Sequence, residues 1–385
     1  MRWMRKVKIF PILIFLLVGL GSLEIFSYFL VRMKLLLFNE TPTFYQTDRS
    51  NLHTDWWVER DVWGVWHKPN TKAIQNSSCI YAEYSSNEIG ARDGPFSVVA
   101  ESHPRLLLLG DSMAEGFGVN FEDTAHRQIE KISGFDLLNF GISGGAGPVN
   151  YWLLYEHLAK KYQHDGIIIF FMPANDFKDN DYQHYKESGV TFVDGKVERY
   201  RPYYKKVGDN QYEYFIPENA RKHDNLAFSS NSSEWKWPTM QQFLVDYFWF
   251  SNALRTLKVA LLGRNSGAGY SGYFDASVEQ QKAAVYFIDQ IISASEAKNI
   301  VLVSIPTELD FRQVKNGHDR KEMLWWKSFA TARERLRKPV VFLDLVDSEP
   351  SSIEKLFIPC DGHWNPYGNK WAAEIIAAKL KELRF

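Results

Sequence analysis

Five apolar runs recur between residues 105 and 345, and segments with helical spacing separate them. The runs are leucine-rich or β-branched and lie at 105–109, 135–139, 166–172, 299–305 and 340–345. Continuous apolar runs of this kind predict parallel strands that are buried on both faces. Helical spacing is found near 121–133, 148–162, 277–297, 321–336 and 366–384. This alternation predicts right-handed crossovers and an α/β fold, a three-layer α/β/α sandwich with a five-stranded parallel sheet.

The N-terminal region, residues 1–38, has a different pattern. Basic residues precede an apolar stretch from Ile9 to Val31, in which Glu24 is the sole charge. The stretch is long enough to span a bilayer, and no small-residue cleavage site follows it, so we expect an uncleaved signal anchor. The preceding positive charge predicts a cytoplasmic N-terminus with the rest of the chain outside. Because a carboxylate is costly in hydrocarbon, Glu24 should lie near the outer interface or pair with another transmembrane helix.

Two further segments interrupt the alternation of strands and helices. Residues 39–100 are polar and Trp-rich, and they predict a leader of short strands and turns that packs on the main domain, 101–385, or lines its site. An insertion at 178–275 contains Asp-Gly and Gly-Asp-Asn turns that predict a small antiparallel meander, followed by helical spacing over Met240–Leu262. The insertion is either a lid or substrate platform, or its aromatic side chains pack it onto the sheet.

Composition narrows the range of partners. The 385 residues carry a net charge of -1, which gives no electrostatic case for binding nucleic acid. No Walker loop or dinucleotide fingerprint is present, so we expect no cofactor. Cys79 and Cys360 lack the histidine spacing of a zinc site, so we expect no metal. The two cysteines form either a disulfide or two free buried thiols.

Candidate catalytic residues follow the ends of the first three predicted strands. Ser112, Gly141 and Asn175 each come directly after an apolar run, and the carboxyl ends of parallel strands are where open α/β sheets bind ligands. A serine hydroxyl needs a base within hydrogen-bond reach, and His363 with Asp361 near the C-terminus is the candidate pair. Taken alone, the turn that contains Ser112 is equally typical of an ordinary helix cap. The Asp-x-His segment, taken alone, is typical of a surface turn.

Together these segments resemble the four sequence blocks of the SGNH (GDSL-type) hydrolase family, across residues 105–177 and 299–385. The resemblance implies a flavodoxin-like fold, Ser112 as nucleophile, and His363 and Asp361 as its base and orienting carboxylate. It also implies an oxyanion hole built from Ser112, Gly141 and Asn175. The blocks are Gly110-Asp111-Ser112, Asn139-Phe140-Gly141-Ile142-Ser143-Gly144, Pro173-Ala174-Asn175-Asp176 and Asp361-Gly362-His363. Two departures are a proline where the family has glycine in the third block, and a carboxylate only two residues before the histidine.

The resemblance and the N-terminal span together imply a function outside the cytoplasmic membrane. We expect a serine esterase that removes O-acyl groups, in particular O-acetyl, from an envelope glycan through an acyl-enzyme. If a sugar hydroxyl resolves the acyl-enzyme in place of water, the protein is a polysaccharide O-acetyltransferase. A hypothesis from another class is a non-catalytic glycan-binding or assembly subunit, which recruits a membrane partner through Glu24.

Overall fold

The computed structural model describes residues 9–33, 35, 56–76, 80–100, 104–187, 200–217, 244, 248–251, 253–254, 257, 270–348, 350–358 and 361–383. The chain divides into two compact units. The smaller comprises Met1–Arg49, Asn76–Ile80 and Ser233–Ala268, and the larger comprises Ser50–Gln75, Tyr81–Ser232 and Gly269–Phe385. Both cysteines lie outside the described residues, as does the Asp-Gly turn predicted at 194–195.

A five-stranded parallel sheet forms the centre of the larger unit, and this confirms the predicted fold class. The strand order is β11-β10-β7-β5-β6. Its register places Leu108 of β5 beside Asn139 of β6 and Ile168 of β7. The strands β5 and β7 are buried along their whole length, as their uninterrupted apolar sequences predict. The strands are β5 (Arg105–Gly110), β6 (Asp136–Gly141), β7 (Gly166–Phe171), β10 (Asn299–Ser304) and β11 (Val340–Asp344).

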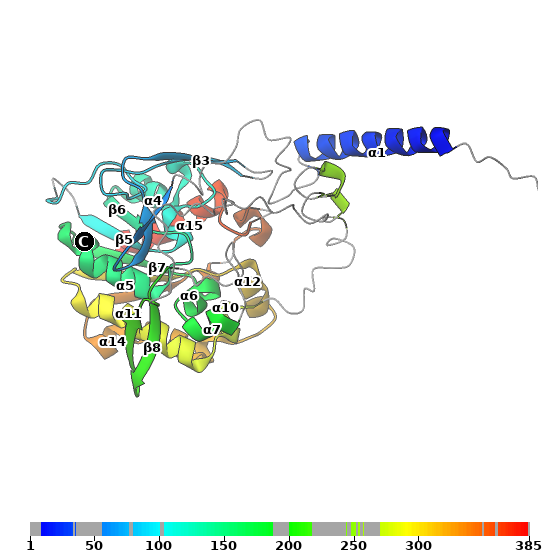
Figure 1. The fold of residues 1–385 in the computed structure, drawn as a ribbon. Helices are drawn as coiled ribbons and strands as arrows, with labels where there is room; N and C mark the ends of the chain where they lie inside the picture. Colours follow the sequence, from blue (N-terminus) through cyan, green and yellow to red (C-terminus); the bar gives the residue numbers. More distant parts are fainter. Residues whose placement is uncertain are drawn as a thin grey trace, which may run out of the picture. The chain divides into compact units, whose positions relative to one another are not determined.

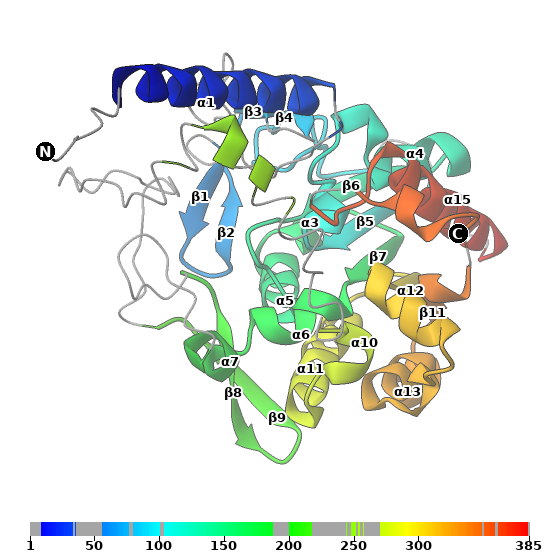
Figure 2. The same cartoon turned by 90° about the vertical axis from the view of Figure 1, so that its right-hand side faces the viewer.

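Helices cover both faces of this sheet in the larger unit. Figures 1 and 2 show α4 (Ala125–Ser133) packed with α15 (Pro366–Glu382) on one side of the strands. On the other side lie α5 (Pro148–His157) and α11 (Val278–Ala294), the latter beginning at a capping box between Ser277 and Gln280. Shorter helices complete the layers: α3 (Ser112–Glu115), α6 (Pro173–Asp179), α7 (Tyr182–Glu187), α10 (Gly272–Asp275), α12 (Glu308–Lys315), α13 (Leu324–Ala330) and α14 (Ala332–Leu336).

The leader contributes two small two-stranded sheets, β1 (Trp57–Arg60) paired antiparallel with β2 (Gly64–His67), and β3 (Lys72–Asn76) paired with β4 (Tyr81–Ser85). Several of its large aromatic side chains are core residues. Trp66 is buried and stacks on Phe140 of β6, with ring centroids 6.4 Å apart. The leader therefore contributes to the same hydrophobic core as the central sheet.

The insertion at 178–275 is described in part. In the larger unit, β8 (Tyr203–Gly208) and β9 (Gln211–Phe215) pair antiparallel about a turn in which Asn210 has a φ of 56°. From the predicted helix at 240–262, residues 244, 249–251, 253–254 and 257 have helical backbone. The smaller unit also contains α1 (Ile9–Arg32), whose segment Pro11–Leu30 has a mean hydropathy of 2.1 and is long enough to cross a membrane.

Candidate active site

The turn that carries Ser112 is shaped by the residues on either side of it. Gly110 ends β5 with a φ of 154°, and a side chain there would lie 2.8 Å from Cβ of Phe170. The Asp111 carboxylate accepts a hydrogen bond of 2.9 Å from the Met113 N–H and so caps α3. Ser112 is therefore the first residue of a short helix that begins at the carboxyl end of a buried strand, as predicted.

His363 lies against this serine, although 251 positions separate the two residues in the chain. The distance from Ser112 Oγ to His363 Nε2 is 2.7 Å, and His363 Nδ1 is hydrogen-bonded to the Asp361 carboxylate. The Phe117 ring packs against the imidazole, with ring centroids 4.7 Å apart. The arrangement matches a nucleophile, a base and an orienting carboxylate within hydrogen-bond reach of one another.

A tight turn explains how Asp361 reaches the imidazole from only two residues away. The Ile358 N–H donates to the His363 carbonyl at 2.7 Å, and the Asp361 N–H donates back to the Ile358 carbonyl at 3.1 Å. Gly362, with a φ of 90°, completes the turn in a conformation that favours glycine. Trp364 is buried against Phe170 of β7 and anchors the turn to the sheet.

The charge of Asp361 is stabilised by its neighbour. Burial alone would raise the pKa of Asp361, but the hydrogen bond from His363 and the charge of that ring outweigh burial, and the pKa is lowered. Asp361 is therefore ionised at neutral pH and fixes a proton on Nδ1 of His363. With Nδ1 protonated, Nε2 can accept the proton of the Ser112 hydroxyl.

Asn175 lies near the serine turn, but its amide group is engaged by carboxylates. Asn175 Nδ2 is 3.0 Å from Asp111 Oδ2 and 3.1 Å from Asp179 Oδ2, while Oδ1 is buried without a hydrogen bond among the described residues. Arg201, from the insertion, binds Asp179 at 3.2 Å. An amide group has two hydrogens, so Asn175 can donate to an oxyanion only after releasing one carboxylate.

Gly141 has a structural role that differs from the predicted one. Its N–H donates to Asn139 Oδ1 at 2.8 Å, so this donor is not directed at an oxyanion. A Cβ atom at this position would lie 2.2 Å from the Glu115 N atom and 2.7 Å from Ala114 Cβ. Glycine is needed here because β6 and α3 are in close contact, and the oxyanion role of Gly141 stays a prediction that requires its N–H to leave Asn139 Oδ1.

The next two N–H groups of the same loop are also occupied. Ile142 donates to the Gly110 carbonyl at 3.0 Å, and Ser143 donates to Glu115 Oε2 at 2.5 Å. In this conformation the N–H groups of Gly141, Ile142 and Ser143 are therefore all bonded within the protein.

Sequence reasoning missed the buried carboxylate of Glu115, three residues after the nucleophile. Its oxygens accept from Trp56 Nε1 at 3.1 Å and from the Ser143 N–H, and Oε2 lies 3.1 Å from His67 Nε2. His67 Nδ1 faces the Gly90 carbonyl at 2.8 Å, so both ring nitrogens face oxygen atoms. Burial would raise the pKa of Glu115, but His67, Arg92 and Ser143 lower it to about 2.

Arg92 of the leader is a second buried charge in this region. Its guanidinium donates to the backbone carbonyls of Glu83, Glu115, Gly116 and Val119, and it lies 3.8 Å from the centre of the Tyr84 ring. Because three of these carbonyls follow the nucleophile, Arg92 fixes the path of the chain immediately after α3.

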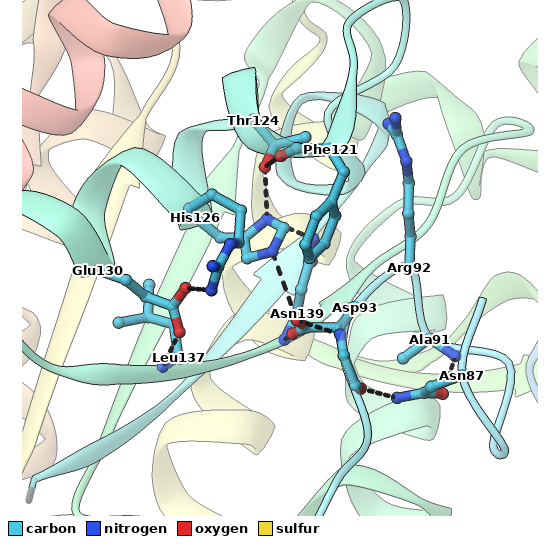
Figure 3. Close-up of polar contacts among 12 residues, drawn as sticks. Asn87, Ala91, Arg92, Asp93, Phe121, Thr124, His126, Glu130, Leu137 and Asn139 are labelled. Atoms are coloured by element: carbon cyan, nitrogen blue, oxygen red, sulfur yellow. Dashed lines mark hydrogen bonds and ion pairs between the residues drawn. The ribbon is translucent and has the colours of Figure 1, made fainter. Parts of the chain in front are cut away.

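A further buried cluster orients Asn139 (Figure 3). The Asp93 carboxylate accepts the Asn139 backbone N–H at 2.9 Å and lies 3.6 Å from His126 Nε2. The Asn139 amide donates to His126 Nδ1 at 3.0 Å and to the Ala114 carbonyl at 3.1 Å, which leaves its oxygen for Gly141. This series of hydrogen bonds therefore connects the leader to both α3 and the loop after β6. Sequence spacing gives no signal for either cluster, because their members come from distant segments.

Comparisons with known proteins show structural likeness without detectable sequence relationship. No family model and no curated protein matches the chain. Among solved structures, a lipolytic protein of the G-D-S-L family from Veillonella parvula shares 12% identity over 73% of this chain and 99% of its own, with a TM-score of 0.36. A lipase/acylhydrolase from Enterococcus faecalis shares 13% identity over 72% of this chain and 96% of its own, with a TM-score of 0.35.

A carbohydrate esterase family 2 enzyme from Corynascus thermopiles shares 12% identity over 74% of this chain and 68% of its own, with a TM-score of 0.37. The chain is similar to these G-D-S-L family, lipase and esterase structures at low TM-scores and is distant from them in sequence. Across the described residues, no group of three or more His, Cys, Asp or Glu side chains is placed to hold a metal ion.

Proposed function

We propose that this chain is a membrane-anchored serine hydrolase that acts on carboxylic esters. The observation that carries the proposal is the 2.7 Å contact between Ser112 Oγ and His363 Nε2, with Asp361 bonded to the other ring nitrogen. The imidazole and the carboxylate are partly exposed, at 25% and 24% of their side-chain surface, so a substrate can reach them. The same contact argues against the alternative of a non-catalytic binding subunit.

The reaction follows from these contacts. His363 accepts the hydroxyl proton as Ser112 Oγ attacks the ester carbonyl carbon, and the carbonyl oxygen becomes an oxyanion. His363 then donates that proton to the leaving alkoxide, and an acyl-Ser112 ester remains. Water, activated by His363, attacks the acyl carbon and releases the carboxylic acid and the free serine. The proposed oxyanion donors are the Ser112 backbone N–H, the Gly141 backbone N–H and the Asn175 amide. Gly141 must first leave Asn139 Oδ1, and Asn175 must first release a carboxylate.

The substrate class and location belong to the same proposal. The apolar helix α1, preceded by basic residues, supports a single-pass anchor with the catalytic unit on the extracytoplasmic side of the cytoplasmic membrane. The substrates available there include acylated envelope glycans, and we propose an O-acetyl group as the acyl group. An acceptor sugar in place of water would make the same acyl-enzyme an O-acetyltransferase.

Hydrolysis of a chromogenic acetate ester by the full-length protein tests this function. Ser112→Ala and His363→Ala should each reduce the rate by at least 10³-fold, because each removes a group that acts on the reacting atoms. The exposed residues Ser351 and His318 provide matched controls, and their alanine variants should retain the wild-type rate. Equal rates in all five proteins would refute the proposal. An esterase releases free acetate, whereas a transferase moves the acetyl group to added oligosaccharide, so measuring both products separates the two activities.

A further inference from the structure

The carboxylate of Glu24, in the apolar helix α1, is bound by a distant segment of the same unit. Glu24 Oε1 accepts the backbone N–H of Trp249 at 2.7 Å, and Oε2 accepts that of Phe250 at 2.9 Å. The Trp249 ring packs edge-on against Tyr28, with ring centroids 5.7 Å apart, and only 3% of Trp249 is exposed. Both carboxylate oxygens of Glu24 therefore accept backbone hydrogen bonds from the same chain. Glu24 does not need the partner on another transmembrane helix that the sequence suggested.

The position of Glu24 gives this contact a physical meaning. It lies six residues before Leu30, the end of the apolar segment, which corresponds to about 9 Å along the helix. At that depth an unpaired carboxylate is costly, and so are free N–H groups at the first turn of a helix. The contact between Glu24 and residues 249–250 satisfies both at once. In water neither group would need the other.

The segment that Glu24 holds has an exposed apolar surface. Leu244, Phe248, Leu254 and Leu257 are each exposed by 39% to 49%, and most of the apolar side chains of α1 are exposed as well.

From these observations we infer that the described residues 244, 248–251, 253–254 and 257 belong to an interfacial membrane segment, which Glu24 docks onto α1 and whose apolar side chains contact lipid acyl chains. The inference rests on the proposed anchor and extends it from one helix to two segments. Lipid is favoured over a second copy of the chain because Glu24 and Tyr28, which contact this segment, belong to the apolar helix α1. In addition, the only charged group within the span is already paired, so no ionic group there remains to specify another helix.

The contact also bears on whether α1 is retained. Cleavage after the apolar stretch would remove Glu24 and leave the N–H groups of Trp249 and Phe250 without their acceptor. We therefore expect the membrane-bound protein to carry an intact N-terminus, which mass spectrometry of the purified chain measures directly. A mature chain that begins after residue 33 would overturn the inference.

Photochemical labelling by lipid tests the membrane contact itself. Benzoylphenylalanine replaces Leu254 in the full-length protein, which is reconstituted into phosphatidylethanolamine/phosphatidylglycerol vesicles containing a radiolabelled phospholipid. The same probe at Phe15 of α1, 80% exposed, reports on the anchor, and at Val278 of the larger unit, 60% exposed, it provides the control. We expect lipid adducts at Leu254 within about threefold of those at Phe15, and at least tenfold fewer at Val278.

The outcomes separate this inference from the proposed anchor. If Phe15 is labelled and Leu254 is not, or if Leu254 yields a cross-linked dimer, the interfacial segment is refuted while the anchor stands. If Phe15 itself is unlabelled, the anchor fails too. Glu24→Leu should reduce labelling at Leu254 to the Val278 level and leave Phe15 unchanged, and Glu24→Gln, which keeps one acceptor oxygen, should be intermediate. Unchanged labelling at Leu254 in Glu24→Leu would refute the docking role of Glu24.

Discussion

The buried carboxylate of Glu115 gives the sharpest quantitative prediction. It lies on the nucleophile helix, bonds the Ser143 N–H of the neighbouring loop, and contacts His67 of the leader at 3.1 Å. Glu115→Gln keeps the size of the side chain and an acceptor oxygen, but it removes the negative charge. The variant therefore isolates the electrostatic contribution of Glu115 from its packing.

The magnitude follows from the pKa. The folded pKa of Glu115 is lowered from 4.5 to about 2, and this difference corresponds to roughly 3 kcal/mol of stability. Because the folded value lies below the unfolded one, this contribution is complete above pH 4.5 and is lost as the pH falls toward 2. We therefore expect Glu115→Gln to be less stable than wild type by about 3 kcal/mol at pH 6, and the difference to shrink steadily below pH 4.5.

Urea unfolding of the full-length protein in detergent, followed by tryptophan fluorescence at pH 6 and at pH 3, measures this difference. Glu374→Gln on the exposed face of α15 is the matched control and should change stability by less than about 0.5 kcal/mol at both pH values. We also expect kcat for ester hydrolysis to fall about tenfold or more in Glu115→Gln, because Glu115 holds α3 against the loop that contains Ser143. A stability difference that is the same at pH 6 and pH 3 would refute the electrostatic account.

Three further substitutions test the site. Asp361→Asn should lower kcat by roughly 10³-fold to 10⁴-fold, because the neutral amide no longer fixes the proton on His363 Nδ1. The circular dichroism spectrum should be unchanged. A wild-type kcat would contradict this role of Asp361. Gly141→Ala should lower the free energy of unfolding in urea by about 1–3 kcal/mol, since its Cβ would lie 2.2 Å from the Glu115 N atom. An unchanged free energy would show that β6 and α3 can separate freely. Arg92→Met should lower the free energy of unfolding by about 3–5 kcal/mol in the same assay, because it leaves buried carbonyls unpaired and removes one of the two groups that compensate the charge of Glu115. A loss below 1 kcal/mol would exclude that role.

The central sheet could be predicted from the sequence because its signal is local. Four consecutive leucines in β5 have no polar alternation, and only a strand covered on both faces can bury all of them. The contact between Ser112 and His363 could be predicted only through the family resemblance, since no local pattern relates residues 251 positions apart. Charged residues such as Glu115 and Arg92 appear in the sequence as ordinary surface positions, and their burial depends on tertiary partners.

The contact made by the Gly141 N–H could not be predicted from the sequence, for a different reason. Which way a loop N–H points depends on backbone dihedral angles and on the side chains that compete for it. Asn139 occupies the Gly141 N–H only because Asp93 and His126 hold the asparagine side chain in place. A sequence block identifies the loop, but it does not fix the direction of any single donor within it.

The leader residues are best understood as part of the catalytic unit, because they hold the elements that form it. In one buried cluster, His67 and Arg92 compensate the charge of Glu115 on α3. In the other, Asp93 binds Asn139 on β6. Natural domains are stable by only about 5–15 kcal/mol, and an uncompensated buried carboxylate removes a large part of that margin. The parallel sheet supplies the position of Ser112, but charges that keep α3 and its neighbouring loop together come from residues 56–93. These buried charges make the folding energy of the central sheet depend on the leader.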